Sequence, residues 1–149
     1  MKSISNNITT QQIYVPNEVK ALTILALSDN YGKGKGKLSE AEGYLFFAKK
    51  GIDLFNSFPE KYARFYRAWY HSPRKNLSMS ADFWRSLTIF RDTEQNFRMS
   101  DVYVMMILIG LSETDENIAK FVENVLLSND NLTAYRSSRN TKICLEQTN

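Results

Sequence analysis

The chain has 149 residues, enough to bury the core of one ordinary domain without help from a disulfide or a metal. Its hydrophobic fraction of 43% and charged fraction of 23% are typical of a soluble globular protein and exclude a chain that is disordered throughout. The one cysteine, Cys144, excludes an internal disulfide and a cysteine-based zinc cluster, and it indicates a cytoplasmic protein.

The net charge of +3 conceals an uneven distribution of charge along the chain. Residues 31–75 hold ten Lys and Arg against four Asp and Glu, a net charge of +6. Residues 92–130 hold two basic against eight acidic residues, a net charge of −6. A segregation of this size can attract an oppositely charged partner to each half of the chain.

Neither a secretory signal nor a membrane-spanning helix is expected. Residues 1–12 contain no apolar core, and the longest apolar run, residues 102–111, has about half the length that a spanning helix needs. We therefore expect a soluble protein with no membrane partner.

Apolar residues recur at helical spacing, and strand-like alternation is not evident. The sequence thus predicts an all-α fold, a single compact domain over residues 1–149 with about five to six short helices. Residues 1–14 and 129–149 are predicted as loose, flexible tails.

The first predicted helix covers residues 16–28. Pro16 suits the first turn of a helix, because its ring fixes a helical φ and its missing N–H has no partner there. The apolar face is formed by Val19, Leu22, Leu25 and Ala26. Residues 29–37 contain three closely spaced glycines and are predicted as a flexible loop.

The second predicted helix covers residues 40–55. Ser39 and Glu42 have the spacing of a capping box, in which each side chain binds the backbone N–H of the other residue. We expect Tyr44, Phe47 and Phe55 to be buried, and Gly43 and Gly51 to weaken this helix.

Ser57 and Glu60 repeat the capping spacing and predict a third helix that ends at Ser72 and Pro73. Pro59 is tolerated in its first turn. Aromatic residues are spaced to form the buried face, with basic residues opposite. The aromatic set is Tyr62, Phe65, Tyr66 and Trp69.

A fourth helix is predicted over residues 81–90, with Ser80 as its cap and Phe83, Leu87 and Phe90 on its apolar face. The run 102–111 can be a buried strand or a buried helix by periodicity alone. Its introduction by Ser100 and Asp101 and its methionines favour a buried helix, which we predict.

The last predicted helix follows Ser112 and Asp115, which resemble a capping box. Its first turn is acidic, where the helix dipole favours negative charge. Its apolar stripe is formed by Ile118, Phe121, Val122 and Val125.

Known catalytic and phosphate-binding motifs are missing from the sequence. Residues 32–37, GKGKGK, lack the spacing of a phosphate-binding P-loop, and His71 is the one histidine, which excludes a two-histidine metal site. We expect no metal and no cofactor. An enzyme that uses His71 is the third hypothesis, behind two kinds of binding protein.

The first hypothesis is a non-enzymatic accessory or regulatory protein that binds DNA or RNA through phosphates. A basic loop, a basic helix face and the residues that follow would supply the contacts. The proposed set is Lys33, Lys35, Lys37, Lys61, Arg64, Arg67, His71, Arg74 and Lys75.

The second hypothesis is a protein-binding inhibitor, adaptor or immunity-type factor that uses its acidic region 92–130. The partner would be another protein or a second copy of the chain in a homodimer. The proposed contacts are Glu113, Asp115, Glu116 and Glu123.

Overall fold

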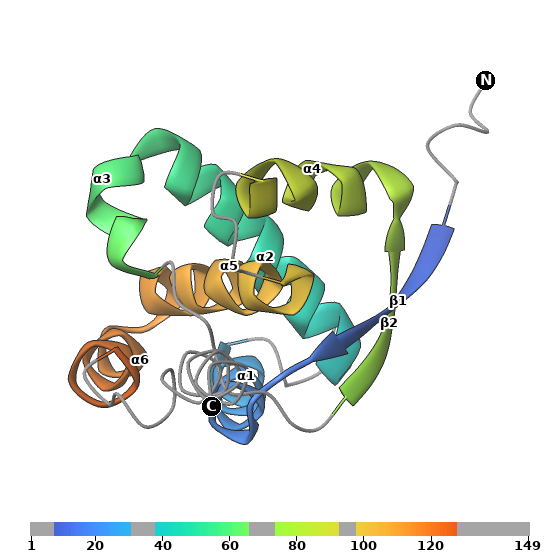
Figure 1. The fold of residues 1–149 in the computed structure, drawn as a ribbon. Helices are drawn as coiled ribbons and strands as arrows, with labels where there is room; N and C mark the ends of the chain where they lie inside the picture. The colour runs from blue at the N-terminus through green and yellow to red at the C-terminus, as the bar shows by residue number, and fades with distance from the viewer. Residues whose placement is uncertain (1–7, 31–37, 66–73, 93–97, 128–149) are drawn as a thin grey trace, which may run out of the picture.

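The computed structural model describes residues 8–30, 38–65, 74–92 and 98–127 (Figure 1). These residues form six helices and one two-stranded sheet. In chain order the elements are β1 (Ile8–Tyr14), α1 (Asn17–Asn30), α2 (Glu40–Ser57), α3 (Pro59–Tyr62), a 3₁₀ turn (Ala63–Phe65), β2 (Arg74–Ser80), α4 (Ala81–Asp92), α5 (Met99–Thr114), α6 (Glu116–Phe121) and a π-helical turn (Val122–Leu126).

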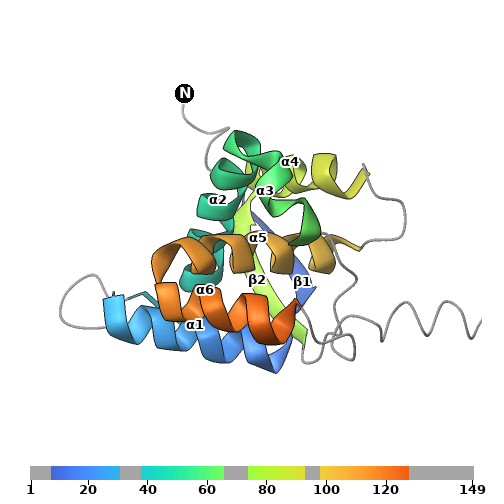
Figure 2. The ribbon, with the colours of Figure 1, turned by 90° about the vertical axis from the view of Figure 1, so that its left-hand side faces the viewer.

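The helix α5 forms the centre of the molecule, and its residues 100–111 are all buried. A helix that is apolar on every side must be covered on every side. The other elements provide that cover, with α2 and α4 on one side and α1 and α6 on the other (Figures 1 and 2). The prediction of a buried helix over 102–111 is therefore confirmed.

Two glycines let α2 and α5 pack backbone against backbone. A Cβ atom added to Gly51 would overlap the carbonyl group of Met106, and one added to Gly110 would overlap the carbonyl group of Phe47. The expectation that Gly51 weakens α2 is thus incomplete, because its missing side chain also lets the backbones of α2 and α5 come into contact.

Helix α1 begins at Asn17, directly after Pro16, and extends to Asn30, two residues into the loop predicted at 29–37, the rest of which lies outside the described residues. Its buried face also differs from the prediction. Val19, Leu22 and Ala26 are buried, whereas Leu25 is 49% exposed and Leu27 is buried in its place. Helix α2 begins with the predicted capping box. The Glu42 N–H donates to the Ser39 hydroxyl at 3.2 Å, and the Ser39 N–H donates to the Glu42 carboxylate at 2.9 Å.

The predicted third helix starts differently. Ser57 ends α2, and Phe58 occupies the N-cap position of α3 without a side-chain hydrogen bond. Pro59 takes the first helical position as expected. Tyr62 and Phe65 are buried with their rings edge to face at 5.7 Å, as predicted, whereas Tyr66, Trp69 and the predicted end at 72–73 lie outside the described residues.

The sheet corrects the all-α prediction and, over residues 8–14, the predicted tail at 1–14. Residues 1–7 and the predicted tail at 129–149 lie outside the described residues. The strands β1 and β2 pair antiparallel from Ile8 with Ser80 to Tyr14 with Arg74. The alternation of apolar and polar residues along these strands is short. The buried apolar residues that point inward are Ile13 on β1 and Leu77 and Met79 on β2. So few inward residues give a weak sequence signal.

Helix α4 matches the prediction, since the Phe83 N–H donates to the Ser80 hydroxyl at 3.1 Å. Phe83 and Leu87 are buried, and the Phe90 ring packs edge to face on Phe55 at 5.5 Å.

The last helix begins later than predicted. Helix α5 runs on to Thr114, and the Ser112 hydroxyl donates to the Leu108 carbonyl inside it. Asp115 is the N-cap of α6 and accepts from two backbone N–H groups. The buried stripe is Ile118, Val122 and Leu126, whereas Phe121 and Val125 are 39% and 37% exposed.

Over the described ranges, no helix has both the length and the apolar character needed to cross a bilayer. One cluster of buried apolar side chains extends from Ile13 in β1 to Leu127 after the π-helical turn.

The contact at Gly51 predicts that alanine substitution there lowers the stability of the protein more than alanine substitution at Gly43. We expect Gly51→Ala to lower the free energy of unfolding by about 2 kcal/mol, because overpacking against a rigid backbone outweighs the better helix propensity of alanine. Urea denaturation followed by circular dichroism measures this change.

Gly43→Ala is the matched control. Its added Cβ would lie 2.7 Å from the Cδ1 atom of Leu27, the end of a side chain that can move. We expect a change smaller than about 1 kcal/mol there. Equal stability of the Gly51→Ala variant and the wild type would contradict the proposed role of this glycine.

Candidate functional site

The predicted phosphate-binding residues fall into three groups. Lys61 and Arg64 lie in α3 and the 3₁₀ turn, and Arg74 and Lys75 begin β2. The remaining members of the set lie outside the described residues, and they are Lys33, Lys35, Lys37, Arg67 and His71.

The two described pairs lie near opposite ends of α5. Arg64 borders a cavity together with Ser112, near the C-terminal end of α5, whereas the strand that pairs with Arg74 contacts Ser100, near its N-terminal end. At 1.5 Å per residue, these two serines are roughly 18 Å apart along the helix axis. The described cations therefore do not form one patch.

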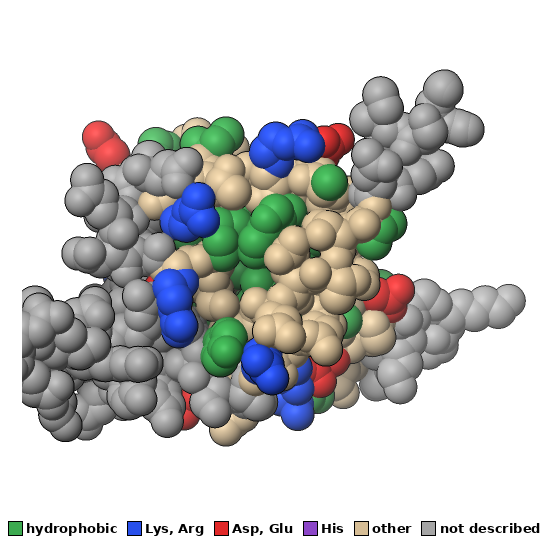
Figure 3. Space-filling model, turned by 45° about the vertical axis from the view of Figure 1, so that its right-hand side comes forward, with side chains coloured by type: hydrophobic (Ala, Val, Ile, Leu, Met, Phe, Trp, Pro, Cys, Tyr) green, Lys and Arg blue, Asp and Glu red, His purple; other side chains and the backbone are tan. Residues whose placement is uncertain are grey.

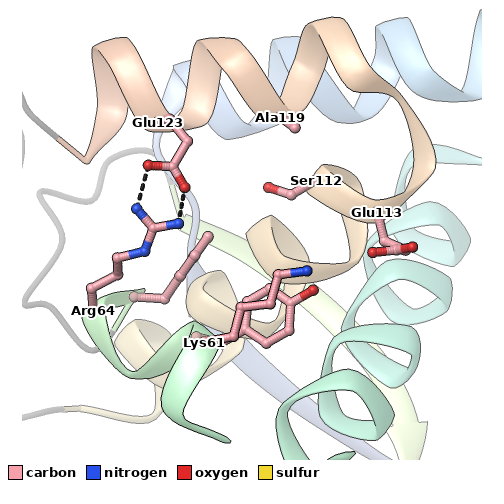
Figure 4. Close-up of a pocket in the computed structure, with 8 residues that line it drawn as sticks. Lys61, Arg64, Ser112, Glu113, Ala119 and Glu123 are labelled. Carbon is pink, nitrogen blue, oxygen red and sulfur yellow. Dashed lines mark hydrogen bonds and ion pairs between the residues drawn. The ribbon is translucent and has the colours of Figure 1, made fainter. Parts of the chain in front are cut away.

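Lys61 and Arg64 face acidic residues across a small cavity between α3, α5 and α6 (Figure 4). The cavity has a volume of about 120 Å³ and is also lined by Ser112, Glu113 and Glu123. The Arg64 guanidinium donates to both carboxylate oxygens of Glu123. Residues predicted to bind phosphate and residues predicted to bind a protein partner thus meet at this cavity.

The acidic set is split between internal and exposed roles. Asp115 caps α6, and Glu123 binds Arg64. Glu113 and Glu116 are exposed. Two of the four predicted partner contacts therefore already serve the fold.

The outer face of the sheet is a surface that the sequence analysis did not identify. Register places Gln12 opposite Asn76 and Thr10 opposite Ser78, with all four side chains exposed. The hydroxyls of Thr10 and Ser78 lie 3.1 Å apart, and the Arg74 guanidinium donates to the Gln12 carboxamide at 3.3 Å. The face that includes the sheet and α4 has a centre of neutral polar and hydrophobic side chains, with Lys and Arg as well as Asp and Glu around it (Figure 3).

Cations gather at one end of this face. The Arg98 guanidinium lies 5.3 Å from the centre of the Tyr14 ring, and Tyr14 is directly opposite Arg74. The Tyr14 N–H donates to the Ser100 hydroxyl at 2.9 Å, which ties β1 to the start of α5. Arg74 and Arg98 thus both lie beside Tyr14, at the end of β1 that is hydrogen-bonded to α5.

The neighbouring Lys75 is neutralised in part by Glu40, at a distance of 3.3 Å between Nζ and Oε2. Burial acts to raise the pKa of Glu40, but hydrogen bonds from the Tyr44 hydroxyl, at 2.6 Å, and from Lys75 outweigh it. The pKa of Glu40 is therefore lowered. Burial, together with the bond to Glu40, raises the pKa of Tyr44 and keeps its hydroxyl protonated as a donor.

Within the described ranges, no group of three or more His, Cys, Asp and Glu side chains could hold a metal ion. Comparison of the chain with protein-family models, with curated proteins and with solved structures found no match.

The Arg64–Glu123 pair predicts a modest coupling energy. Because both side chains are more than one-third exposed, a double-mutant cycle with Arg64→Ala and Glu123→Ala is expected to give about 0.5–1 kcal/mol at low salt. Denaturation of the four proteins at low and high salt measures it. A coupling of zero at low salt would contradict an energetic role for the pair.

The Glu40 cluster predicts a dependence on pH. Lys75→Met should raise the pKa of Glu40, because the variant loses a hydrogen bond and a positive charge that favour the carboxylate. A lowered pKa stabilises the folded state above the unfolded pKa of about 4.3, and this stabilisation is lost as pH falls through the folded pKa.

Two measurements check this prediction. Titration of the Glu40 carboxyl carbon by NMR should show a higher midpoint in Lys75→Met, and the stability difference between the variant and the wild type should shrink below about pH 4. An unchanged midpoint would show that Lys75 does not set the charge of Glu40.

Proposed function

We propose that this protein binds nucleic acid without catalysing a reaction, through the outer face of the β1–β2 sheet and the arginines at its end. The observation that carries the proposal is the composition of that face. No outward side chain of the two strands is a carboxylate, although acidic residues are frequent elsewhere in the chain. The outward set is Ile8, Thr10, Gln12, Tyr14, Arg74, Asn76, Ser78 and Ser80.

A surface of this composition favours phosphate binding for two reasons. A carboxylate at the contact would repel the backbone of DNA or RNA, and none is present among the outward strand residues. Arginine binds phosphate through paired N–H groups, and hydroxyl and carboxamide side chains add neutral hydrogen bonds. Arg74 and Arg98 are the arginines placed to provide such contacts.

Fewer cations are proposed here to bind phosphate than the sequence predicted. Arg64 is bound to Glu123, and Lys75 is bound to Glu40, so their charges are partly compensated within the fold. Arg74 donates to an uncharged partner, the Gln12 carboxamide, and among the described residues no carboxylate is paired with it. The cations of the described chain that we assign to phosphate are therefore Arg74 and Arg98.

A second candidate function, binding of a protein partner or a second copy of the chain, has one observation in its favour. The exposed Phe121 and Val125 lie one turn apart on α6 and the π-helical turn that continues it. An exposed apolar pair on one helix face suits a partly apolar partner surface. Recovery of one stoichiometric protein after nuclease treatment would favour this function over nucleic-acid binding.

The proposed function predicts a steep dependence on salt. Fluorescence anisotropy with a labelled DNA duplex and a labelled single strand should show affinity that falls as salt rises, by about 0.9 in the logarithmic slope per phosphate contact on a duplex. Replacing both arginines, Arg74→Ala with Arg98→Ala, should reduce that slope by about 2 and weaken binding to every sequence alike.

Arg64→Ala is the matched control, since it also removes an arginine but near the opposite end of α5. Its salt slope should equal that of the wild type. Loss of binding in the Arg64→Ala variant, with no effect of the double replacement, would move the site to the cavity beside α6. No binding at low salt by the wild type would contradict the proposed function.

A further inference from the structure

We infer that the β1–β2 sheet reads base edges in the major groove of duplex DNA, an inference that rests on the proposed function and names its ligand. The structural basis is a two-by-two block of hydrogen-bonding side chains, Thr10 and Gln12 on one strand and Ser78 and Asn76 on the other.

The dimensions of the sheet fit the groove. Two strands lie about 4.8 Å apart, and the major groove of B-form DNA is about 12 Å wide, enough for a two-stranded ribbon with its side chains. The pair of strands has no third neighbour, since the sheet contains β1 and β2 alone among the described residues. Neither edge is therefore blocked by another strand.

The chemistry of the block matches what base edges offer. A glutamine or asparagine carboxamide can donate to N7 and accept from N6 of adenine at once, which no other base permits in the same geometry. Gln12 and Asn76 lie side by side across the strands, so two neighbouring adenines are the expected target. Thr10 and Ser78 can donate to or accept from any base next to them.

The four side chains are available for exchange. The bonds they make are exposed ones, between the two hydroxyls and between Arg74 and Gln12, and these compete with water already. A base edge can replace them without leaving a buried polar group unpaired. Arg74 then becomes free to bind a phosphate at the edge of the block.

The scaffold beneath the block holds it in place. Ile13, Leu77 and Met79 anchor the inner face in the core, and the bond between Tyr14 and Ser100 fixes the strand end. Readout of bases depends on side chains that already have the productive spacing, because ordering them on binding would cost entropy.

The same face favours a duplex over a single strand. Single-stranded ligands are held mainly by stacking of bases on exposed aromatic rings. Tyr14 is the aromatic residue among the outward side chains of β1 and β2, and the Arg98 guanidinium already lies over its ring. The face thus offers hydrogen bonds in place of a stacking platform.

Selection from a random duplex library tests the inference. The full-length protein should enrich a short motif that contains adjacent adenines. Gln12→Ala and Asn76→Ala should each reduce the preference for adenine at one position by roughly tenfold, while binding to an unrelated duplex and its salt slope stay unchanged. Circular dichroism verifies that each variant folds.

Asn56→Ala provides the control, since it removes an asparagine carboxamide from an exposed position at the C-terminal end of α2, outside the sheet. This variant should select the same motif as the wild type. Salt-dependent binding without any enriched motif would overturn the readout and leave the proposed function standing. Tighter binding to single strands than to the enriched duplex would also overturn it. No binding to any nucleic acid would overturn both.

Discussion

The contact between α2 and α5 at Gly51 and Gly110 is the constraint on which the rest of the structure depends. Backbone contact at two points fixes how these helices cross, and α5 then offers its remaining sides to the other elements. Because residues 100–111 are buried all round, every other layer is placed by reference to this one helix. The Lys50 ammonium extends the contact by donating to the Thr114 hydroxyl at 3.2 Å.

The sheet has its position for the same reason. Its inner residues pack on the core, and Ser100 at the start of α5 accepts the N–H of Tyr14. The outward strand side chains are uncharged apart from Arg74, and no carboxylate is among them. One carboxylate, that of Asp101, lies beside the second arginine of the proposed site, since it accepts the Arg98 backbone N–H at 2.9 Å. The packing of the sheet against α5 thus determines both the position of the sheet and which side chains its outer face exposes.

The sequence predicted most helices because each has a local signal. Three of these signals involve residues close together in the sequence and can be recognised in one sequence. They are the capping box of Ser39 and Glu42, the cap at Ser80, and the apolar run after Ser100. The sheet has no such local signal. Leu77 and Met79 on β2 are recognised as inward-facing strand residues only once β2 is paired with β1, which carries Ile13. The cap at Asp115 was misplaced to Ser112 because α5 continues for one more turn than its apolar run.

The candidate site shows the same limit. Arg74 was identified from charge alone, whereas Gln12 and Asn76 were overlooked, because isolated amides are common in any chain and only register sets them together.

Pairing of Ile8 with Ser80 closes a loop that encompasses the first three helices. Closing a long loop costs chain entropy, so the pairing of these strands depends on the packing of the helices between them. The outer face of the sheet consequently exists only where two segments far apart in the sequence are both folded. Any ligand held there would raise the melting temperature of the whole protein by mass action, and a nicked or partly unfolded chain would present nothing for it to bind.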